Sequence, residues 1–299
     1  MRKVYILLLA LFVIIPFSIY SYDLLNLPIS AAQGAIGGEG GAYFGPSNTI
    51  AANPAALAYF NGRRAELSFV KYPQSVNIGG MAYYQGFDKI GVLSAALNYC
   101  NYGKIEGTDE YGNVTHYFTP QAFLLNMTFS REIVKSLAAA AIFKYGYSSI
   151  DTMANMFMVG GFDVNYKFND LRLGLLIDDI GGELMKGYGS VPIDIKYRFS
   201  SSYALAENSY ILLVDIFYDK TNGFDMSAGF EWNINGALLF RMGYIYSDSR
   251  NLKYDSSGDI LAGFNLGLGV RTKRFNLDYS YTPLVVLGDA HRITLGINF

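Results

Sequence analysis

The sequence predicts an all-β fold: an antiparallel transmembrane β-barrel of about fourteen strands, with a short N-terminal helical hatch inside the lumen. Three observations lead to this prediction. The chain is 51% hydrophobic and only 16% charged, yet no apolar run after the N-terminus is long enough to span a bilayer as a helix. Most of the chain alternates apolar and polar residues with a period of two. The last strand, 291–299, keeps this alternation and ends on the aromatic residue Phe299.

The first 21 residues are predicted to be a secretory signal peptide. Arg2 and Lys3 precede an apolar run from Val4 to Ile15, and small or polar residues follow near Ser21. This is the order of the positive, apolar and cleavage regions of a signal. The alternative is a single N-terminal anchor helix. Export through a signal, combined with barrel strands, predicts the bacterial outer membrane as the location.

Residues 22–61 are predicted to form the hatch or plug segment. The segment is rich in Gly and Ala, and its stretch 53–58 reads Asn-Pro-Ala-Ala-Leu-Ala. An Asn at the N-cap followed by Pro at the first helical position is a helix-start signal. We therefore expect Asn53 to cap a helix that lies across the lumen. The candidate hatch residues are Asn53, Pro54, Gly40 and Gly41.

Residues 62–299 are predicted to form the barrel. The stretch 275–282, for example, places Phe, Leu and two Tyr on one face and Asn, Asp, Ser and Thr on the other, as expected when one face meets lipid and the other meets water. The predicted strands are 64–71, 76–85, 89–99, 121–131, 137–148, 154–168, 170–178, 192–204, 209–219, 225–233, 237–247, 260–272, 275–283 and 291–299.

The connections between these strands are expected to differ in length at the two ends of the barrel. If the first strand runs outward, the connections on the periplasmic side are all short, whereas the long ones, 101–120, 179–191 and 248–259, lie outside. Outer-membrane barrels have this distribution, and a soluble two-sheet sandwich has no reason for it.

Charged residues of the strands are predicted to face the lumen, because Lys or Arg facing lipid at the midplane costs about 2–4 kcal/mol. Two interpretations stay open: paired structural charges, or a polar passage whose selectivity the charges tune. The predicted lumen-lining residues are Lys144, Asp163, Lys167, Arg172, Asp194, Lys196, Arg198, Asp215, Glu231, Arg241, Arg271, Asp278 and Arg292.

The C-terminal strand is predicted to pair with the first strand, with Phe299 near Leu67. Ile293, Leu295 and Ile297 are then expected to face the membrane on the same side as Phe299. We interpret Phe299 as a C-terminal assembly signal that the barrel-assembly machinery engages.

The motif search favours a protein without enzymatic activity. Cys100 is the single cysteine and is interpreted as a packed hydrophobic residue. His116 and His291 lack metal-site spacing, and no Gly-x-Ser-x-Gly sequence occurs. The acidic pairs at 109–110 and 178–179 are interpreted as solvated or turn-forming residues at loop ends. With a net charge of −2, no nucleic-acid partner is expected. No cofactor is predicted either.

Several fragments resemble the PorV/PorQ proteins, a family similar to the FadL-type outer-membrane transporters. The resemblance covers nearly the whole mature chain, although Gly-Glu-Gly at 38–40 stands where the family has Gly-Met-Gly. The fragments are 34–44, 53–58, 102–105, 109–112, 191–193, 237–244, 278–279 and 287–293.

This resemblance implies a fourteen-stranded barrel with its N-terminal segment folded inside. It also implies FadL-like transport of a hydrophobic small molecule across the outer membrane. The alternative is a PorV-like, non-transporting component of a protein secretion and surface-attachment system. A surface hydrolase would need a Ser/His/Asp cluster that the sequence does not indicate. The implied partners are outer-membrane lipid, the barrel-assembly machinery, and either a hydrophobic ligand or a secreted protein.

Overall fold

The structure of the 299-residue chain is a computed structural model. It describes residues 23–38, 40–42, 52–187, 193–247, 261–284 and 288–299. The predicted signal peptide and most of the predicted loop 248–259 lie outside the described residues. Within the described ranges, no helix has the length and apolar character needed to cross a membrane.

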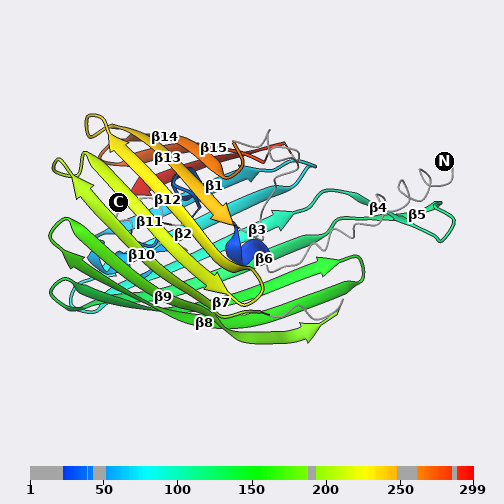
Figure 1. The fold of residues 1–299 in the computed structure, drawn as a ribbon. Coiled ribbons are helices and arrows are strands. Elements are labelled where there is room, and N and C mark those ends of the chain that lie inside the picture. The colour runs from blue at the N-terminus through cyan, green and yellow to red at the C-terminus, as the bar shows by residue number, and fades with distance from the viewer. Residues whose placement is uncertain (1–22, 39, 43–51, 188–192, 248–260, 285–287) are drawn as a thin grey trace.

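Fourteen antiparallel strands form a closed barrel, as the sequence predicts (Figure 1). Each strand of the barrel pairs with its neighbours in sequence, except that β3 pairs with β6 because the β4–β5 hairpin is inserted between them. The barrel strands are β1 (Arg63–Lys71), β2 (Asn77–Phe87), β3 (Gly91–Asn101), β6 (Gln121–Val134), β7 (Leu137–Ile150), β8 (Met153–Phe168), β9 (Leu171–Lys186), β10 (Lys196–Leu205), β11 (Tyr210–Asp219), β12 (Gly223–Asn233), β13 (Leu238–Ser247), β14 (Phe264–Arg271), β15 (Phe275–Pro283) and β16 (Asp289–Asn298).

The C-terminal strand closes the barrel against the first strand. Leu295 of β16 lies opposite Leu67 of β1. The prediction of this pairing is confirmed, but the predicted register of Phe299 is wrong. Its backbone N–H donates to the carbonyl oxygen of Arg63 at 3.0 Å. Phe299 therefore lies at the start of β1, four residues before Leu67, and its side chain is exposed.

The two ends of the barrel differ as predicted. At the short-turn end, which lies beside the C-terminus in Figure 1, every connection is short: 88–90, 135–136, 169–170, 206–209, 234–237 and 272–274. The opposite end, the loop end, carries the longer connections and the hairpin of β4 (Ile105–Thr108) and β5 (Val114–Phe118). This hairpin projects beyond the barrel wall (Figure 1).

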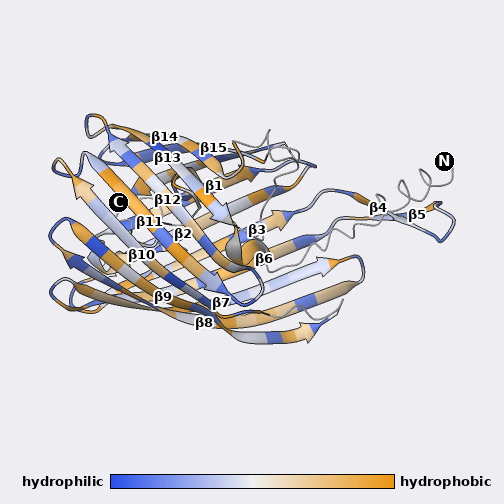
Figure 2. Ribbon diagram, viewed as in Figure 1, coloured by the Kyte–Doolittle hydropathy of each residue, from blue (hydrophilic) through white to orange (hydrophobic). Residues whose placement is uncertain are grey.

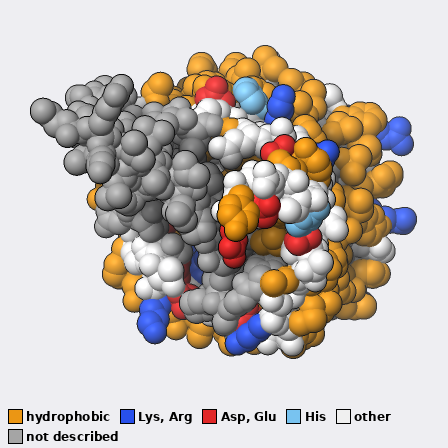
Figure 3. All heavy atoms as spheres, turned by 90° about the vertical axis from the view of Figure 1, so that its right-hand side faces the viewer, with side chains coloured by type: hydrophobic (Ala, Val, Ile, Leu, Met, Phe, Trp, Pro, Cys, Tyr) orange, Lys and Arg blue, Asp and Glu red, His pale blue; other side chains and the backbone are white. Residues whose placement is uncertain are grey.

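The outer surface of the barrel is apolar. Side chains alternate along the strands between an exposed outer face and a buried inner face, and Figure 2 shows the matching change of hydropathy. Seen from the loop end, hydrophobic side chains form the visible perimeter of the barrel (Figure 3). Aromatic rings stack near the short-turn end, where Tyr210 contacts Phe230 and Trp232. This is the surface expected of a barrel that spans a bilayer.

Strand β9 is longer than predicted. It continues to Lys186, so the pair Asp178-Asp179 lies inside a strand, whereas the prediction placed it at a loop end. Both carboxylates are buried, at 4% and 3% exposure, so the interpretation of solvated acids is wrong for this pair.

The other acidic pair, 109–110, does lie in an exposed turn. Asp109 accepts the backbone N–H groups of Tyr111 and Asn113 at 2.9 Å each, so it forms the turn that joins β4 to β5. Hydrogen bonds from Asn113 lower the pKa of Asp109 below its ordinary value. The interpretation of this pair as turn-forming acid is confirmed.

The N-terminal segment contains little helix. Its described parts are α2 (Asp23–Asn26), α3 (Ala31–Ala35) and the 3-10 helix η1 (Ala55–Tyr59). The predicted helix at 53–58 is thus a single 3-10 turn, and a helical hatch is not confirmed. Small residues allow the segment to pack tightly against the wall: Ala31, Ala32, Ala35, Ala52 and Ala55 are all 0% exposed.

Candidate functional site

The N-terminal segment, defined as described residues 23–38, 40–42 and 52–61, lies inside the barrel. Helix α3 contacts β13 to β16, whereas η1 contacts β3, β6, β7 and β8. These two groups of strands belong to different parts of the wall. The described parts of the segment therefore contact different parts of the inner wall.

Side chains of the wall hold the backbone of this segment. Asp215 on β11 accepts the N–H groups of Gly40 and Gly41, at 2.8 and 3.2 Å. Asp163 on β8 accepts the N–H of Ala55 at 2.8 Å.

Further contacts come from three more strands. On β16, Thr294 accepts from Ala31 N and Arg292 donates to Pro28 O. The remaining contacts are donated by Ser130 to Pro54 O, by Ser202 to Ala42 O and by Arg198 to Ala52 O. Because buried backbone groups must be hydrogen-bonded, these wall residues determine where the segment can lie.

The four predicted hatch residues all lie within the described segment. Gly40 and Gly41 are the two residues whose backbone Asp215 binds. A side chain at Gly41 would collide with Ser200 and Arg198, so glycine is required there for close approach to the wall. Pro54 precedes η1 and accepts a hydrogen bond from Ser130.

Replacing Asn53 with alanine is expected to destabilise the segment by about 1–3 kcal/mol. Asn53 is 0% exposed, and its Oδ1 accepts from Ala56 N at 3.2 Å and from Asn165 Nδ2 at 2.7 Å. Removing it leaves both donors without this acceptor in a buried site. Hydrogen exchange of the 52–61 amides should increase, whereas exchange of barrel-strand amides should not. Unchanged protection of these amides would contradict the role of Asn53 in fixing the segment.

The predicted lumen-lining residues occupy three kinds of position. Most are buried on the inner face of the wall, Asp194, Lys196, Arg172 and Arg271 are half-buried, and Lys167 is exposed at the short-turn end. The buried ones are Lys144, Asp163, Arg198, Asp215, Glu231, Arg241, Asp278 and Arg292. Their carboxylates and cations face the same enclosed space as the N-terminal segment.

A β-bulge organises one group of these charges, the Lys144 cluster (Lys144, Asp178, Asp179 and Lys196). The register between β8 and β9 shifts so that Asp178 and Asp179 together lie opposite Gly161. Asp179 has φ of 60°, which turns two successive carboxylates inward. Lys144 Nζ lies 2.6 Å from Asp178 Oδ2 and 2.8 Å from Asp179 Oδ1. Lys196 lies 3.9 Å from Asp179.

A second group, the Arg241 cluster, consists of Arg241, Glu231 and Asp278. Arg241 Nε lies 2.6 Å from Glu231 Oε2, and its Nη1 lies 2.6 Å from Asp278 Oδ1. All three side chains are buried. These residues come from the adjacent strands β12 and β13 and from β15, so their ion pairs connect three strands on the inner face of the wall.

Sequence reasoning missed a third group of buried polar residues near the closure of the barrel. Arg64 on β1 lies 2.6 Å from Glu66, which also accepts from the Tyr84 hydroxyl at 2.7 Å. The signal was present, because Arg64 and Glu66 alternate with apolar residues along β1.

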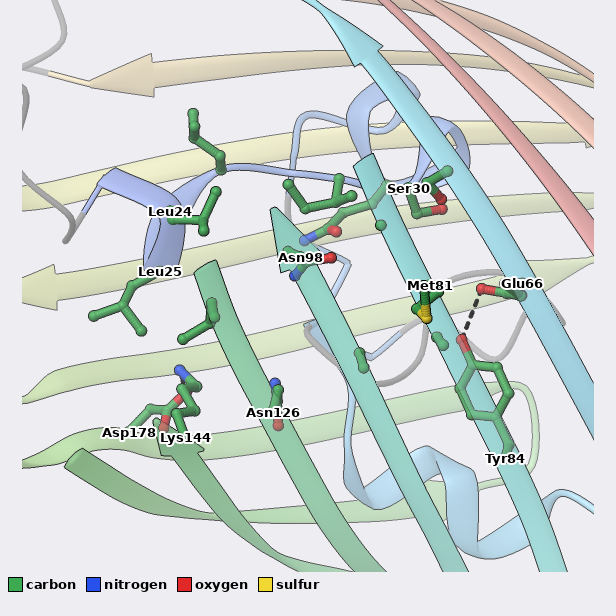
Figure 4. Close-up of a pocket in the computed structure, with 18 of the residues that line it drawn as sticks. Leu24, Leu25, Ser30, Glu66, Met81, Tyr84, Asn98, Asn126, Lys144 and Asp178 are labelled. Atoms are coloured by element: carbon green, nitrogen blue, oxygen red, sulfur yellow. Dashed lines mark hydrogen bonds and ion pairs between the residues drawn. The ribbon is translucent and has the colours of Figure 1, made fainter. Parts of the chain in front are cut away.

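A cavity of about 90 Å³ lies between the N-terminal segment and the wall (Figure 4). Leu24 and Leu25 line it from α2, together with Leu27 and Ile29. The wall supplies both polar and apolar groups. The polar ones are Glu66, Ser68, Tyr84, Asn98, Asn126, Lys144, Asp178, Lys196 and Arg198, and the others are Gly80, Met81, Ala82, Ala96, Leu124 and Leu176. The segment side is therefore mostly apolar, with Ser30 and Gln33 as its polar members, and the wall side is mixed with more polar than apolar residues.

An apolar cluster lies beside this cavity. Leu24 and Ile29 of the segment pack with Cys100 and Leu124 of the wall. Cys100 is 0% exposed and forms no disulfide, so its interpretation as a packed hydrophobic residue is confirmed. Within the described ranges, no group of three or more His, Cys, Asp or Glu side chains could hold a metal ion.

No protein-family model and no curated protein matches the chain in sequence. Solved structures do match in fold. A mutant of TodX, described as a monoaromatic hydrocarbon channel, aligns over 90% of this chain and 98% of its own, with 14% identity and a TM-score of 0.60. The Pseudomonas putida toluene transporter TodX aligns over 89% and 96%, with 13% identity and a TM-score of 0.60.

A Pseudomonas aeruginosa FadL homologue also matches, over 90% of this chain and 98% of its own, with 10% identity and a TM-score of 0.58. At these identities the likeness shows the fold, which is a FadL-like barrel. The PorV/PorQ part of the resemblance is not supported by these comparisons.

Proposed function

We propose that the protein is an outer-membrane channel that passes a hydrophobic small molecule in the manner of FadL-like barrels. One observation carries the proposal: a cavity lies between the N-terminal segment and the inner wall, and three leucines and Ile29 form most of its segment side, beside Ser30 and Gln33. The described neighbours of the same fold support it, because TodX is a toluene transporter and CymD a monoaromatic hydrocarbon channel. The apolar outer surface supports placement in a bilayer, and the signal-like N-terminus supports the bacterial outer membrane.

The size of the cavity indicates a closed state. An engineered apolar cavity of about 150 Å³ holds one benzene molecule, whereas this cavity measures about 90 Å³. Passage of a monoaromatic compound therefore requires side chains of the N-terminal segment to move away from the wall. The wall itself is a continuous hydrogen-bonded barrel, so the segment is the part that can move at lower cost.

Replacing Ala96 with phenylalanine is expected to reduce uptake of toluene by about tenfold, because the new ring occupies the cavity. Ala96 lies on β3 and lines the cavity. Its neighbour Ala95 points to the opposite face of the same strand. Uptake is measured with labelled toluene in cells that lack other hydrocarbon channels.

The Ala95→Phe variant is the matched control, since it adds the same ring outside the lumen. Transport through this cavity predicts that only Ala96→Phe blocks uptake. Equal uptake by both variants and by wild type would overturn the proposal.

The alternative, a PorV-like component of protein secretion, is favoured by one observation. The β4–β5 hairpin projects beyond the barrel and exposes Tyr111 at 88% and Tyr117 at 52%. Replacing residues 105–118 with a Gly-Ser linker separates the two functions. A channel keeps its uptake of toluene, whereas a docking protein loses attachment of its exported partner. Engagement of the Phe299 strand by the barrel-assembly machinery stays a prediction.

A further inference from the structure

A depression of about 440 Å³ lies at the short-turn end, between the end of the N-terminal segment and the wall. Its floor and sides come from Phe60 and Asn61, from the β2–β3 turn, and from the end of β6. This depression is separate from the cavity in the lumen and shares none of its lining residues.

The β2–β3 turn places a carboxylate and an ammonium group side by side. Asp88 and Lys89 are its two central residues, and the turn is closed by a hydrogen bond from Ile90 N to Phe87 O at 3.2 Å. All four of these residues are exposed and line the depression.

The end of β6 contributes a second cation, Arg131, and a second carboxylate, Glu132. Glu132 is engaged elsewhere, because its Oε1 accepts the backbone N–H of Ser136 at 3.2 Å. Within the described part of the chain, Asp88, Lys89 and Arg131 have no ion-pair partner within 4.0 Å. The depression therefore holds two cations and two carboxylates, and one oxygen of Glu132 is bound by the backbone.

Apolar surface adjoins these charges. Phe87 is 38% exposed and also belongs to the apolar outer surface of β2, β3 and β6, and Ile90 in the turn is 57% exposed. A molecule bound here would have its charged part against Lys89, Arg131 and Asp88. Its apolar part would lie along the outside of the barrel, where acyl chains run in a bilayer.

We propose that this depression is a binding site for the headgroup of an aminophospholipid, a lipid with an ethanolamine phosphodiester. The phosphate accepts charge-assisted hydrogen bonds from Lys89 and Arg131. The primary ammonium donates to the carboxylate of Asp88. The acyl chains pack on Phe87 and Ile90. The site rests on placement of the barrel in a bilayer and is independent of whether the lumen transports anything.

The charge arrangement discriminates among common phospholipids. Phosphatidylglycerol offers the phosphate but no ammonium for Asp88. Phosphatidylcholine offers a quaternary ammonium, which has no N–H to donate. Only the ethanolamine headgroup satisfies all three side chains, so the site should select it.

The test uses the purified full chain in detergent, mixed with equal amounts of phosphatidylethanolamine, phosphatidylglycerol and phosphatidylcholine that carry the same acyl chains. Retained lipid is counted by native mass spectrometry. We expect wild type to retain about five times as much phosphatidylethanolamine as either of the other two lipids. A ratio of about five corresponds to the contribution of one exposed ion pair. Equal retention of the three lipids would overturn the proposal.

Two variants and one matched control locate the site. K89Q/R131Q should lose the retained lipid, whereas D88N should keep a lipid but lose the preference for ethanolamine. The control K167Q/K273Q removes two exposed cations at the same end of the barrel, outside the depression, and should behave as wild type. A specific site would be contradicted if the control lost as much retained lipid as K89Q/R131Q, or if K89Q/R131Q retained as much lipid as wild type. Circular dichroism verifies strand content in each variant.

A competition arm distinguishes a lipid from a soluble phosphate ester. Free O-phosphoethanolamine at the same concentration as the lipid should displace little of it, because it lacks the acyl chains that pack on Phe87 and Ile90. Complete displacement would show a site for the headgroup alone and would overturn the assignment to a lipid.

Discussion

Replacing Arg241 with alanine is expected to lower the free energy of unfolding by about 3–5 kcal/mol, the cost of removing one partner from a buried charge pair. Arg241 is 0% exposed and is the cation shared by Glu231 and Asp278. Without it, Glu231 and Asp278 both lose the cation that they share in an enclosed space. The barrel should unfold at lower urea concentration, measured by loss of the strand signal in circular dichroism with the protein in detergent.

Two comparisons isolate the buried charges. Arg274→Ala removes an exposed arginine at the short-turn end and should change stability by less than about 0.5 kcal/mol. The triple variant Arg241→Met, Glu231→Gln, Asp278→Asn removes all three charges together and should recover much of the loss, because no unpaired ion remains. A triple variant that is as unstable as Arg241→Ala would mean that packing, and not charge, dominates at this position.

The barrel could be predicted from the sequence because strand alternation is a local property. A single strand carries its own signal: in β16, for example, Ile293 and Leu295 alternate with the buried residues Arg292 and Thr294. Pairing of neighbours in sequence then determines the topology. The lengths of the connections distinguish the short-turn end of the barrel from the loop end. These lengths follow from the predicted strand bounds, so no long-range contact has to be known.

Where alternation breaks, the prediction failed. The sequence predicts a strand over 170–178, with Asp178-Asp179 interpreted as solvated or turn-forming acids at a loop end. In the structure the bulge opposite Gly161 turns both acids inward and the strand continues to Lys186. The consecutive acids were the visible signal of a bulge, but a turn produces the same signal. Only the position of Lys144 distinguishes them, and Lys144 lies on β7, which β8 separates from β9, so this is a tertiary contact.

The structure of the N-terminal segment could be predicted only in part, for a different reason. The sequence predicts a Gly- and Ala-rich segment inside the lumen, but not which strands of the wall hold it. Its position depends on side chains such as Asp163 and Thr294, which are far away in sequence and bind its backbone. Because these contacts are made by backbone groups, the amino-acid sequence of the segment has no pattern that predicts them. The same holds for the depression at Lys89 and Arg131, whose residues meet only because β3 pairs with β6.

Replacing Asp215 with alanine is expected to release the N-terminal segment from one side of the wall. Asp215 is 2% exposed and accepts both Gly40 N and Gly41 N. Each buried N–H that loses its acceptor costs about 1–3 kcal/mol, so at least about 2 kcal/mol opposes docking of the segment in the variant. The barrel strands should persist, because Asp215 contributes its side chain, and not its backbone, to this contact.

The rate at which Cys100 is labelled measures the release of the segment. Cys100 is buried against Leu24 and Ile29 of the segment, so a maleimide reagent reaches it only when the segment moves away. A loss of about 2 kcal/mol in docking should accelerate labelling of folded protein by about thirtyfold. The same variant should raise ion conductance in a planar bilayer, because the segment obstructs the lumen.

Two further variants determine whether the carboxylate itself is the cause. Asp215→Asn keeps one acceptor oxygen and should give an intermediate labelling rate. Asp219→Ala removes a carboxylate from the same strand that binds Asn222 in the β11–β12 turn, and should leave Cys100 protected. If Asp215→Ala labels no faster than wild type while its strand content is unchanged, the contacts with Asp163, Thr294 and Arg292 hold the segment without Asp215. The segment would then be a fixed plug, and passage through the lumen would need a different moving part.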